Sequence, residues 1–555
     1  MQNAVRGRFS GVKGCLVLAA GLWLVAGQAR AGLENEIQQL LNGAGLGETR
    51  TAVLLVDLRT GRALVELDAD QPMVPASNMK LITTAAALTR LGADFKFTTR
   101  LSLIPSPGAE ARPAVGGGRT DGTAPTRGSR NGNAVGAASP GAGASSGDVS
   151  GGNAGGTSGG GEPPSLLVQG GGDPAFGDPV LLSEAGLEVE DILTLWTDAV
   201  VATGHPRIRR LMIDDRVFDR VFVNRAWPKA QLHRFSFAQV AGLNFHENLL
   251  AVLPVPAETD GQAPVIQLYP YFPKLRTQNR ATTSAVDGFQ VQRAPGTNRF
   301  TFMGSVRNRR SQPYRVTVND PPMFFAEYFR HKLAEAGVTV DRVERVPTDA
   351  RLDLSQREVL HEINTTLAGV LDRTNQDSQN LFAEALFKRM GREQTGAPGS
   401  FENGAAAVRL FLRDHLASRV GLSAVRVDDG SGLSLNNRAT ARVLVETLSV
   451  MHDDPKLRSV YAGSLARAGH SGTLRERLRG LRSEVYGKSG WLGASAGYAS
   501  TFSGYLVRLD GRVYGFSLLF NGFRPPISNA QVKAVQDQIL EKIDASINAD
   551  ATRRR

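Results

Sequence analysis

Cysteine is almost absent from this chain of 555 residues, which contains only Cys15. Because that residue lies within the first 31, the rest of the chain excludes a disulfide, a thiol nucleophile and a cysteine-ligated metal. The eight histidines show no metal-ligand spacing. We therefore expect neither a metal nor a cofactor.

Aromatic residues are also scarce, at 7% of the chain, and they form no array with basic residues of the kind that binds nucleic acid. We expect no nucleic-acid partner. The formal net charge is +11. A basic protein, if exported, favours an anionic polymer such as the cell wall or nucleic acid, and the charge alone does not choose between them. The sequence leaves the oligomeric state open.

A long apolar run is missing as well. The apolar stretch from about Cys15 to Ala26 is too short to anchor a helix across a bilayer. Basic residues precede it, and Ala29–Ala31 read Ala-Arg-Ala, a small-x-small cleavage pattern. We predict a cleaved signal peptide over residues 1–31, export to the periplasm, no stable transmembrane anchor and at most a loose membrane association. An uncleaved anchor is the alternative.

Glycine is concentrated in one segment, residues 105–164, which holds 18 of the chain's 61 glycines and is otherwise rich in Ala, Ser and Pro. Such a segment buries too little apolar surface to offset its ordering entropy, so we predict disorder. Strand-like sequences, KFTTRLSLI and SLLVQ, flank it. We interpret it as an insertion in a loop between two strands; a linker between domains is the alternative.

Periodic segments flank these irregular ones. The sequence TAVLLVDLRTGRALVELDAD predicts a hairpin that turns at Thr60-Gly61. PPMFFAEYFRHKLAEAGV predicts a helix that starts at proline and stops at glycine, and AQVKAVQDQILEKIDASI predicts a closing helix. Two strands, YASTFSGYLVRL and RVYGFSLLFNGF, are predicted just before that closing helix.

A serine and a lysine stand three residues apart in VPASNMKLITTAAALTRLG, at the start of a predicted helix. One helical turn takes 3.6 residues, so Ser77 and Lys80 share a face. A hydroxyl needs a neighbouring base to act as a nucleophile, and burial favours the uncharged form of a lysine amine. The apolar helix supplies a dry environment, and its N-terminus offers N–H groups to an oxyanion. The alternative is an N-cap serine beside a solvent-exposed lysine.

Two further motifs follow in a fixed order. Ser378-Gln379-Asn380 precedes an apolar helix start, and Lys488-Ser489-Gly490 precedes a strand-rich run. S-x-x-K with S-D-N and K-T-G is the signature of serine β-lactamases and penicillin-binding proteins, and here the three motifs read SNMK, SQN and KSG. Each motif alone has an ordinary alternative, a capping serine or a solvated lysine, but together they indicate a serine acyl-transfer site.

Longer segments carry a closer resemblance. PASNMKLITTAAALTRLG, LLVQGGGDPAF, DDGSGLS and AGHSGTLRERL occur in order between about Leu33 and Ile547. On these segments the chain resembles the class C low-molecular-mass penicillin-binding proteins, the D-alanyl-D-alanine carboxypeptidase/endopeptidase family. The long spacing from Ser77 to Ser378 also resembles this family, in which two added domains fill the gap, rather than class A β-lactamases.

The resemblance implies an acyl-enzyme mechanism on peptidoglycan stem peptides, with β-lactam antibiotics as covalent inhibitors. Ser77 would attack the carbonyl between two terminal D-alanines, and Lys80 would accept its proton. Ser378 would relay a proton to the leaving amine, Asn380 would orient Lys80 and the substrate amide, and Lys488 would hold the local field positive. Water would release the acyl group; attack on a cross-link would be endopeptidase activity.

The resemblance also implies a substrate-binding edge at the third motif. Lys488 and Ser489 would receive the terminal carboxylate, Gly490 lies in the same motif, and the N–H groups of Ser77 and Trp491 would form the oxyanion hole. Trp491 stands where threonine is common, and Ser489 replaces threonine but keeps a hydroxyl. We expect Trp491 either to border the cleft or to pack in the core.

Three other positions bear on specificity. Gln379 stands where aspartate is usual in the second motif. Leu435 follows DGSGLS where relatives often carry an arginine associated with the diaminopimelate carboxylate, and Arg438 comes three residues later. Asp173 resembles a contact for the diaminopimelate amine; a turn-forming aspartate before proline is the alternative.

These features predict an α/β, multi-domain α+β chain with a serine β-lactamase/transpeptidase-like core, about five antiparallel strands flanked by helices, and two β-rich inserted domains. The predicted boundaries are 1–31 for the signal peptide, 33–95 and 353–549 for the catalytic domain, 96–234 and 318–352 for the first inserted domain, and 235–317 for a second domain nested in it.

Three other functions stay open. An S-x-x-K esterase or β-lactamase would share the nucleophile but release penicillin quickly. A catalytically idle wall-binding protein would not react with penicillin at all. A transpeptidase would form cross-links, although the single domain set and the lack of an anchor disfavour it.

Overall fold

The computed structural model describes residues 32–106, 162–493 and 498–553. The predicted signal peptide and most of the predicted insertion lie outside these residues. The described chain divides into two compact units. The first unit comprises the described residues within Met1–Ala86, Asn375–Ser378 and Val408–Arg555, and the second comprises those within Ala87–Thr374 and Gln379–Ala407.

The first unit is built on a six-stranded sheet in which every neighbouring pair is antiparallel. Its strands, in spatial order, are β16 (Ala466–Arg467), β17 (Glu484–Leu492), β18 (Tyr498–Val507), β19 (Val513–Phe523), β1 (Arg50–Asp57) and β2 (Arg62–Leu67). The predicted hairpin is confirmed as β1–β2, and Gly61 in its turn has φ of 67°, a conformation that glycine adopts without strain.

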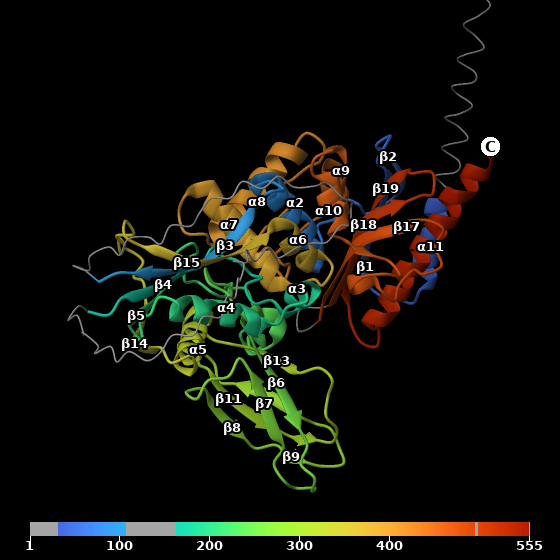
Figure 1. Ribbon diagram of the computed structural model, residues 1–555. Helices are drawn as coiled ribbons and strands as arrows, with labels where there is room; N and C mark the ends of the chain where they lie inside the picture. The colour runs from blue at the N-terminus through green and yellow to red at the C-terminus, as the bar shows by residue number, and fades with distance from the viewer. Residues whose placement is uncertain (1–31, 107–161, 494–497, 554–555) are drawn as a thin grey trace, which may run out of the picture. The chain divides into compact units, whose positions relative to one another are not determined.

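Helices cover both faces of this sheet. Phe516, Leu518 and Phe520 of β19 pack in one cluster with α11 (Asn529–Arg553) and the helix over residues 32–43. Successive side chains of a strand point to opposite faces, and Gly515 lies against Val445 of α9 (Ala441–Asp453). The sheet therefore lies between α11 and α9, and Figure 1 shows α11 along it.

The second unit contains a five-stranded mixed sheet in the order β14 (Thr339–Arg345), β5 (Arg207–Asp214), β4 (Ser165–Gln169), β3 (Lys96–Ile104), β15 (Glu358–Thr366). β4 runs parallel to β5, and β5 runs parallel to β14. Ile104 of β3 lies opposite Ser165 of the antiparallel β4. The segment between them therefore joins two paired strands, as its flanking sequences predict.

Helices and an aromatic cluster complete this unit. Its helices include α3 (Pro179–Glu184), α4 (Val189–Val201), α5 (Pro321–Glu335), α6 (Leu367–Asn375, all but its last residue) and α7 (Asn380–Thr395). Phe176 lies 5.0 Å from Trp196 and 5.4 Å from both Phe245 and Phe325, ring centre to ring centre. Close aromatic pairs of this kind add to the free energy gained by burial.

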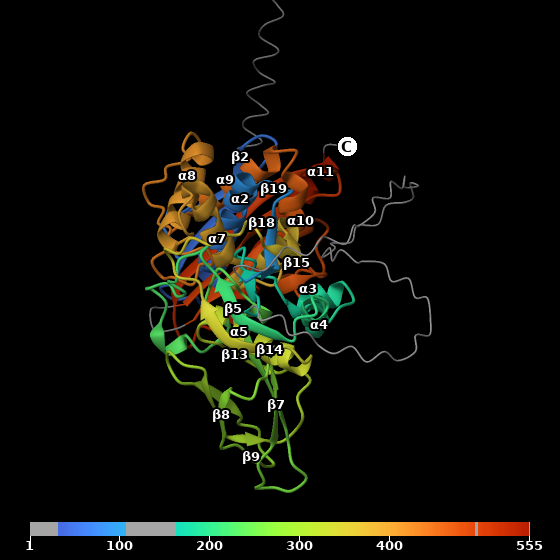
Figure 2. The same cartoon turned by 60° about the vertical axis from the view of Figure 1, so that its left-hand side comes forward.

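Short strands gather at one end of the second unit in both views (Figures 1 and 2). They form three small sheets: β13 (Tyr314–Thr317), β6 (Leu249–Val255) and β7 (Val265–Tyr269); β10 (Gln290–Arg293), β11 (Arg299–Met303) and β8 (Arg276–Asn279); and β12 (Ser305–Val306) with β9 (Thr282–Thr283). The first unit and the predicted catalytic domain differ over residues 87–95, 353–374 and 379–407, so the predicted boundaries stay predictions.

Within the described residues, no helix combines the length and the hydropathy needed to cross a bilayer.

Candidate active site

Ser77 sits on a strained turn in the first unit. It lies in a short 3-10 turn, η1 (Ala76–Asn78), directly before α2 (Met79–Leu91). Ala76 has φ of 45°, which is unusual for a residue with a side chain. The turn is held because Pro75 O accepts hydrogen bonds from Asn78 N at 3.0 Å and from the Thr501 hydroxyl at 3.0 Å. Surrounding contacts thus hold the turn despite its cost, a common arrangement at functional sites.

Lys80 is buried beside this serine. Its side chain has no exposed surface, and its Nζ lies 3.1 Å from Ser77 Oγ and donates to Ser431 O at 2.9 Å. One turn of α2 therefore brings the alcohol and the amine together, as the three-residue spacing predicts. In this geometry an uncharged amine is placed to accept the hydroxyl proton.

The Asp428–Ser434 loop holds the lysine from the other side. Asp429 accepts hydrogen bonds from Gly432 N and Ser434 N, which fold the loop around its carboxylate. Gly432 has φ of 84°, and a Cβ there would meet Ala76 O at 1.8 Å, so the close approach requires glycine. The sequence indicated this loop only through a resemblance and gave no role for Ser431, whose carbonyl orients Lys80.

The third motif runs along β17 against the nucleophile turn. Asn78 Nδ2 donates to Lys488 O at 2.8 Å. A Cβ on Gly490 would lie 2.8 Å from Ser77 N, so the strand can pass so close to the nucleophile only with glycine at this position. The Ser489 hydroxyl donates to the Thr473 hydroxyl at 2.8 Å.

Lys488 is a second buried amine in this unit. It has no exposed surface, and its Nζ donates to Ser489 O at 2.8 Å. Burial holds its pKa well below the usual value, and the charge of Lys80 lowers the pKa further, while Asp377 opposes both. Repulsion between the two ammonium groups disfavours the state in which both are charged. Burial and the neighbouring charge therefore both favour the neutral form of Lys488.

Trp491 is not a core residue, because 52% of its surface is exposed to solvent. Of the two predicted placements, the packed one is wrong. Trp491 shares a face of β17 with the buried Val485, and its exposure shows that this face is uncovered at this end of the strand. An exposed ring next to the third motif offers a stacking surface for a ligand.

The second motif begins in the first unit. Ser378 has φ of 59°, another positive value at a residue with a side chain. Just before it, Asn375 Nδ2 donates to Ser464 Oγ at 2.9 Å and to Thr84 Oγ1 at 3.3 Å. Thr84 lies one turn beyond Lys80 on α2 and donates to its carbonyl oxygen at 2.6 Å. The segment that carries Ser378 is therefore tied to the helix that carries the nucleophile and its base.

Asn380 and Asp173 belong to the second unit. Asn380 starts α7, and its Nδ2 donates to Ser236 O at 2.9 Å. Asp173 is buried, and its carboxylate accepts from Thr365 Oγ1 at 2.7 Å and from Ala175 N at 2.9 Å. The second contact is the turn-forming interaction weighed above as an alternative. The substrate contacts of both residues stay predictions.

Burial raises the pKa of the Asp173 carboxyl to about 7, although the hydrogen bonds from Thr365 and Ala175 oppose the shift. A buried carboxyl of this kind prefers the uncharged form. The group therefore titrates near neutral pH.

Gln379 has a partner that sequence reasoning missed. Its side-chain amide donates to Glu247 Oε1, and Arg373 donates to the same oxygen at 2.8 Å. Glu247 lies in a buried turn in which His246, Glu247 and Asn248 all have φ between 50° and 56°. Nothing in the polar stretch NFHEN marks this turn, and the partners are 132 residues apart. Its geometry arises from tertiary packing.

Comparisons with known proteins agree with this geometry. A family model described as the D-Ala-D-Ala carboxypeptidase 3 (S13) family matches residues 33–112 and 151–545. The D-alanyl-D-alanine carboxypeptidase of Actinomadura sp. (strain R39) is 28% identical over 534 residues, covering 92% of this chain and 84% of that protein. Carboxypeptidase Rv3627c of Mycobacterium tuberculosis is 36% identical over 161 residues, 28% of this chain and 33% of that protein.

Solved structures share the fold. Penicillin binding protein 4 from Haemophilus influenzae superposes with a TM-score of 0.67 at 18% identity, covering 91% of this chain and 99% of that one. The predicted fold class, a mixed α/β chain with an antiparallel sheet and helices of the penicillin-binding type, is confirmed. The family model covers most of the sequence, including all three motifs, and the chain therefore belongs to the D-Ala-D-Ala carboxypeptidase 3 (S13) family.

Proposed function

We propose that this chain is a serine D-alanyl-D-alanine carboxypeptidase that also cuts peptide cross-links as an endopeptidase. The observation that carries the proposal is the buried Lys80 amine, 3.1 Å from Ser77 Oγ at the start of α2. The family match and the carboxypeptidase from Actinomadura support the same reaction and substrate class.

The reaction begins when Ser77 Oγ attacks the carbonyl carbon between the two terminal D-alanines and Lys80 Nζ takes the hydroxyl proton. The N–H groups of Ser77 and Trp491 stabilise the negative oxygen. When the C–N bond breaks, the proton held by Lys80 is relayed through the Ser378 hydroxyl to the leaving amine, and D-alanine departs. Water then attacks the ester, which restores the Ser77 hydroxyl and frees the shortened peptide.

Further residues are proposed to bind the substrate. Lys488 and the Ser489 hydroxyl receive the terminal carboxylate, with Gly490 keeping the strand close to the nucleophile. For Asn380 and Asp173 of the second unit we propose the substrate roles that the resemblance implies, holding the substrate amide and contacting a stem-peptide side chain. No residue of this set requires a metal or cofactor.

β-Lactam antibiotics acylate Ser77 in this proposal, because their strained amide resembles the scissile bond. Penicillin binding protein 4 from Haemophilus influenzae has been solved in complex with a β-lactam, which supports the same reaction here. Cell-wall peptides are the physiological partner, and the predicted export signal places the enzyme in the periplasm.

The test is intact-protein mass spectrometry after incubation with penicillin, followed by digestion of purified peptidoglycan. We expect one stoichiometric adduct on Ser77, absent from Ser77→Ala and retained by Ser355→Ala, an exposed serine of the second unit. The adduct should persist for minutes. Rapid loss with penicilloate release would identify a β-lactamase, and an adduct that survives Ser77→Ala would contradict the proposal.

A further inference from the structure

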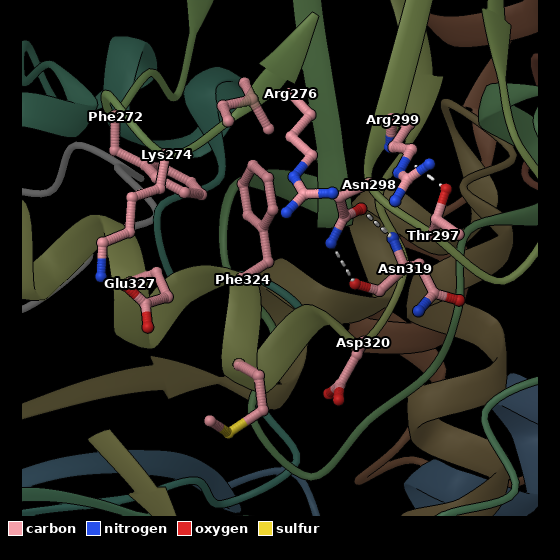
Figure 3. Close-up of a pocket in the computed structure, with 12 residues that line it drawn as sticks. Phe272, Lys274, Arg276, Thr297, Asn298, Arg299, Asn319, Asp320, Phe324 and Glu327 are labelled. Carbon is pink, nitrogen blue, oxygen red and sulfur yellow. Dashed lines mark hydrogen bonds between the residues drawn. The ribbon is translucent and has the colours of Figure 1, made fainter. Parts of the chain in front are cut away.

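A hollow of about 470 Å³ lies in the second unit, between the start of α5 and the strands β8 and β11. Figure 3 shows its lining side chains. We call it the α5 groove. It lies entirely outside the residues assigned above to the proposed reaction, and every residue that lines it belongs to the second unit.

The floor of the α5 groove is apolar. Phe272 and Phe324 meet edge to face with ring centroids 5.3 Å apart, and Met323 stands beside them. Figure 3 shows the ring of Phe324 in the middle of the groove with the Arg276 guanidinium alongside it. Such a floor stabilises the methyl groups and the apolar faces of a ligand.

The rim is cationic. Lys274, Arg276 and Arg299 are exposed, and none of them forms an ion pair with a carboxylate in the described part of the chain. The two carboxylates of the groove are already engaged, Asp320 with Arg345 and Glu327 with Arg330. These three positive charges are therefore free to bind an anionic ligand. The planar guanidinium of arginine pairs well with carboxylates because it can donate two parallel hydrogen bonds.

One edge of the groove is rigid. Asn298 Nδ2 donates to Asn319 O at 2.7 Å, and Asn319 N donates to Asn298 Oδ1 at 2.7 Å (Figure 3). Gln239 Nε2 adds a bond to Asn319 Oδ1 at 3.1 Å. This reciprocal pair fixes the residue before β11 to the segment before α5, so a ligand meets a preformed surface and loses less free energy to ordering.

We propose that the α5 groove binds the glycan–peptide strand of peptidoglycan, with stem-peptide carboxylates on Arg276 and Arg299 and methyl groups against Phe324. The inference rests on the proposed function, which makes this polymer the substrate. The apolar floor favours a glycan–peptide strand over a phosphodiester polymer, because a chain of phosphates has little apolar surface to cover the aromatic rings. The groove thus gives the enzyme a second hold on a polymeric substrate.

The test compares penicillin acylation, which needs only the active site, with binding to peptidoglycan sacculi, which would also use the α5 groove. The full-length Arg276→Glu/Arg299→Glu variant is set beside Arg307→Glu/Arg309→Glu, an exposed pair in the same unit with the same change of charge and outside the groove. In a Ser77→Ala background we expect at least fivefold weaker co-sedimentation of the groove variant with purified sacculi at low ionic strength, and a smaller difference as salt rises. The control pair should bind as the parent does.

The outcomes separate the groove from the active site. Penicillin acylation is measured in proteins that retain Ser77, and it shows whether the active site works. If the parent protein is not acylated, the proposed function is wrong. If acylation is intact, the proposal for the α5 groove is overturned when both double variants lose sacculus binding equally, or when neither loses it. Stronger competition from soluble polyphosphate than from uncross-linked glycan–peptide fragments also overturns it. Arg276→Ala/Arg299→Ala replaces the reversed pair if charge reversal lowers the melting temperature.

Discussion

Two buried lysines, one in each unit, differ in what surrounds them. Lys488 and Lys388 both have no exposed surface. In the second unit, Lys388 Nζ pairs with Asp219 at 2.7 Å and lies 4.6 Å from the centre of the Phe401 ring. In the first unit, Lys488 Nζ donates to a neighbouring backbone carbonyl, and it pairs with no carboxylate among the described residues.

The two lysines are equally buried and differ in their partners, which is why we propose a catalytic role for Lys488 and a structural one for Lys388. Burial lowers the pKa of both groups. For Lys388 the carboxylate of Asp219 opposes that shift, whereas for Lys488 the charge of Lys80 adds to it. A buried ion pair ties elements together but is inert. A buried amine beside another amine has its pKa lowered by both the burial and the neighbouring charge.

The largest effect should come from replacing the first of these lysines. We expect Lys488→Met to slow penicillin acylation by about 100- to 10,000-fold, because it removes both the amine proposed to bind the carboxylate and the electrostatic neighbour of Lys80. The melting temperature should stay level or rise, since the lysine is buried at a cost in free energy. Stopped-flow acylation and thermal unfolding of the same sample measure both effects. Acylation of Lys488→Met at the parent rate would contradict the proposed role of Lys488 in the reaction.

Asp173 is a buried acid, and it tests whether partners and burial together set the protonation state of such a group. Its raised pKa means that the folded chain keeps a proton between about pH 4 and 7 that the unfolded chain has lost. The stability it contributes is therefore complete below pH 4 and is lost as the pH rises through 7. Asp173→Asn mimics the protonated form, so the unfolding free energy of the parent should fall relative to this variant by a few kcal/mol across that range.

Urea unfolding of the two proteins at pH 4.5, 6 and 8 measures this difference. A flat difference, together with a selective loss of activity on diaminopimelate-containing peptides, would favour the substrate contact that the resemblance implies. Unchanged activity with the stated pH dependence would favour the turn-forming carboxyl.

The second lysine should behave in the opposite way to the first. We expect Lys388→Met to lower the free energy of unfolding by about 2 kcal/mol, because it leaves Asp219 without its partner. Penicillin acylation should change little. Adding Asp219→Asn should recover part of the stability, as measured by urea unfolding. A loss of acylation without a loss of stability would reverse the roles assigned to the two lysines.

The sequence predicted the first unit better than the second. The Ser77–Lys80 contact follows from the period of one helix, and the β1–β2 hairpin follows from a short turn between two apolar runs. Both are local, so propensity and spacing suffice. The approach of β17 to Ser77 is long-range, but it came with the resemblance because the motif Lys488-Ser489-Gly490 is conspicuous.

The second unit depends on contacts that no local pattern encodes. Its parallel pairs β4–β5 and β5–β14 join segments far apart in the chain, so register is set by packing rather than by a turn. The left-handed turn at Glu247 contains no glycine, which is the usual signal for positive φ. Trp491 shows the same limit within the first unit, since exposure of an aromatic residue depends on which face of its strand is covered.

Gln379 offers the finest test of how a partner sets the role of a buried group. Its amide donates to Glu247, so aspartate or glutamate there would place two carboxylates together. Since Gln379 directly follows Ser378 in the chain, a displaced Gln379 moves the hydroxyl that we propose serves the leaving amine. We expect Gln379→Glu to slow acylation about tenfold, or about 1.4 kcal/mol, with most of the loss in kcat rather than KM. The defect should shrink at low pH as a carboxylate becomes protonated.

The exchanged pair Gln379→Glu/Glu247→Gln restores one donor and one acceptor and should recover most of the rate. Kinetics of the four proteins between pH 5 and 8 complete the cycle, and additive losses in the double variant would show that the two side chains act independently.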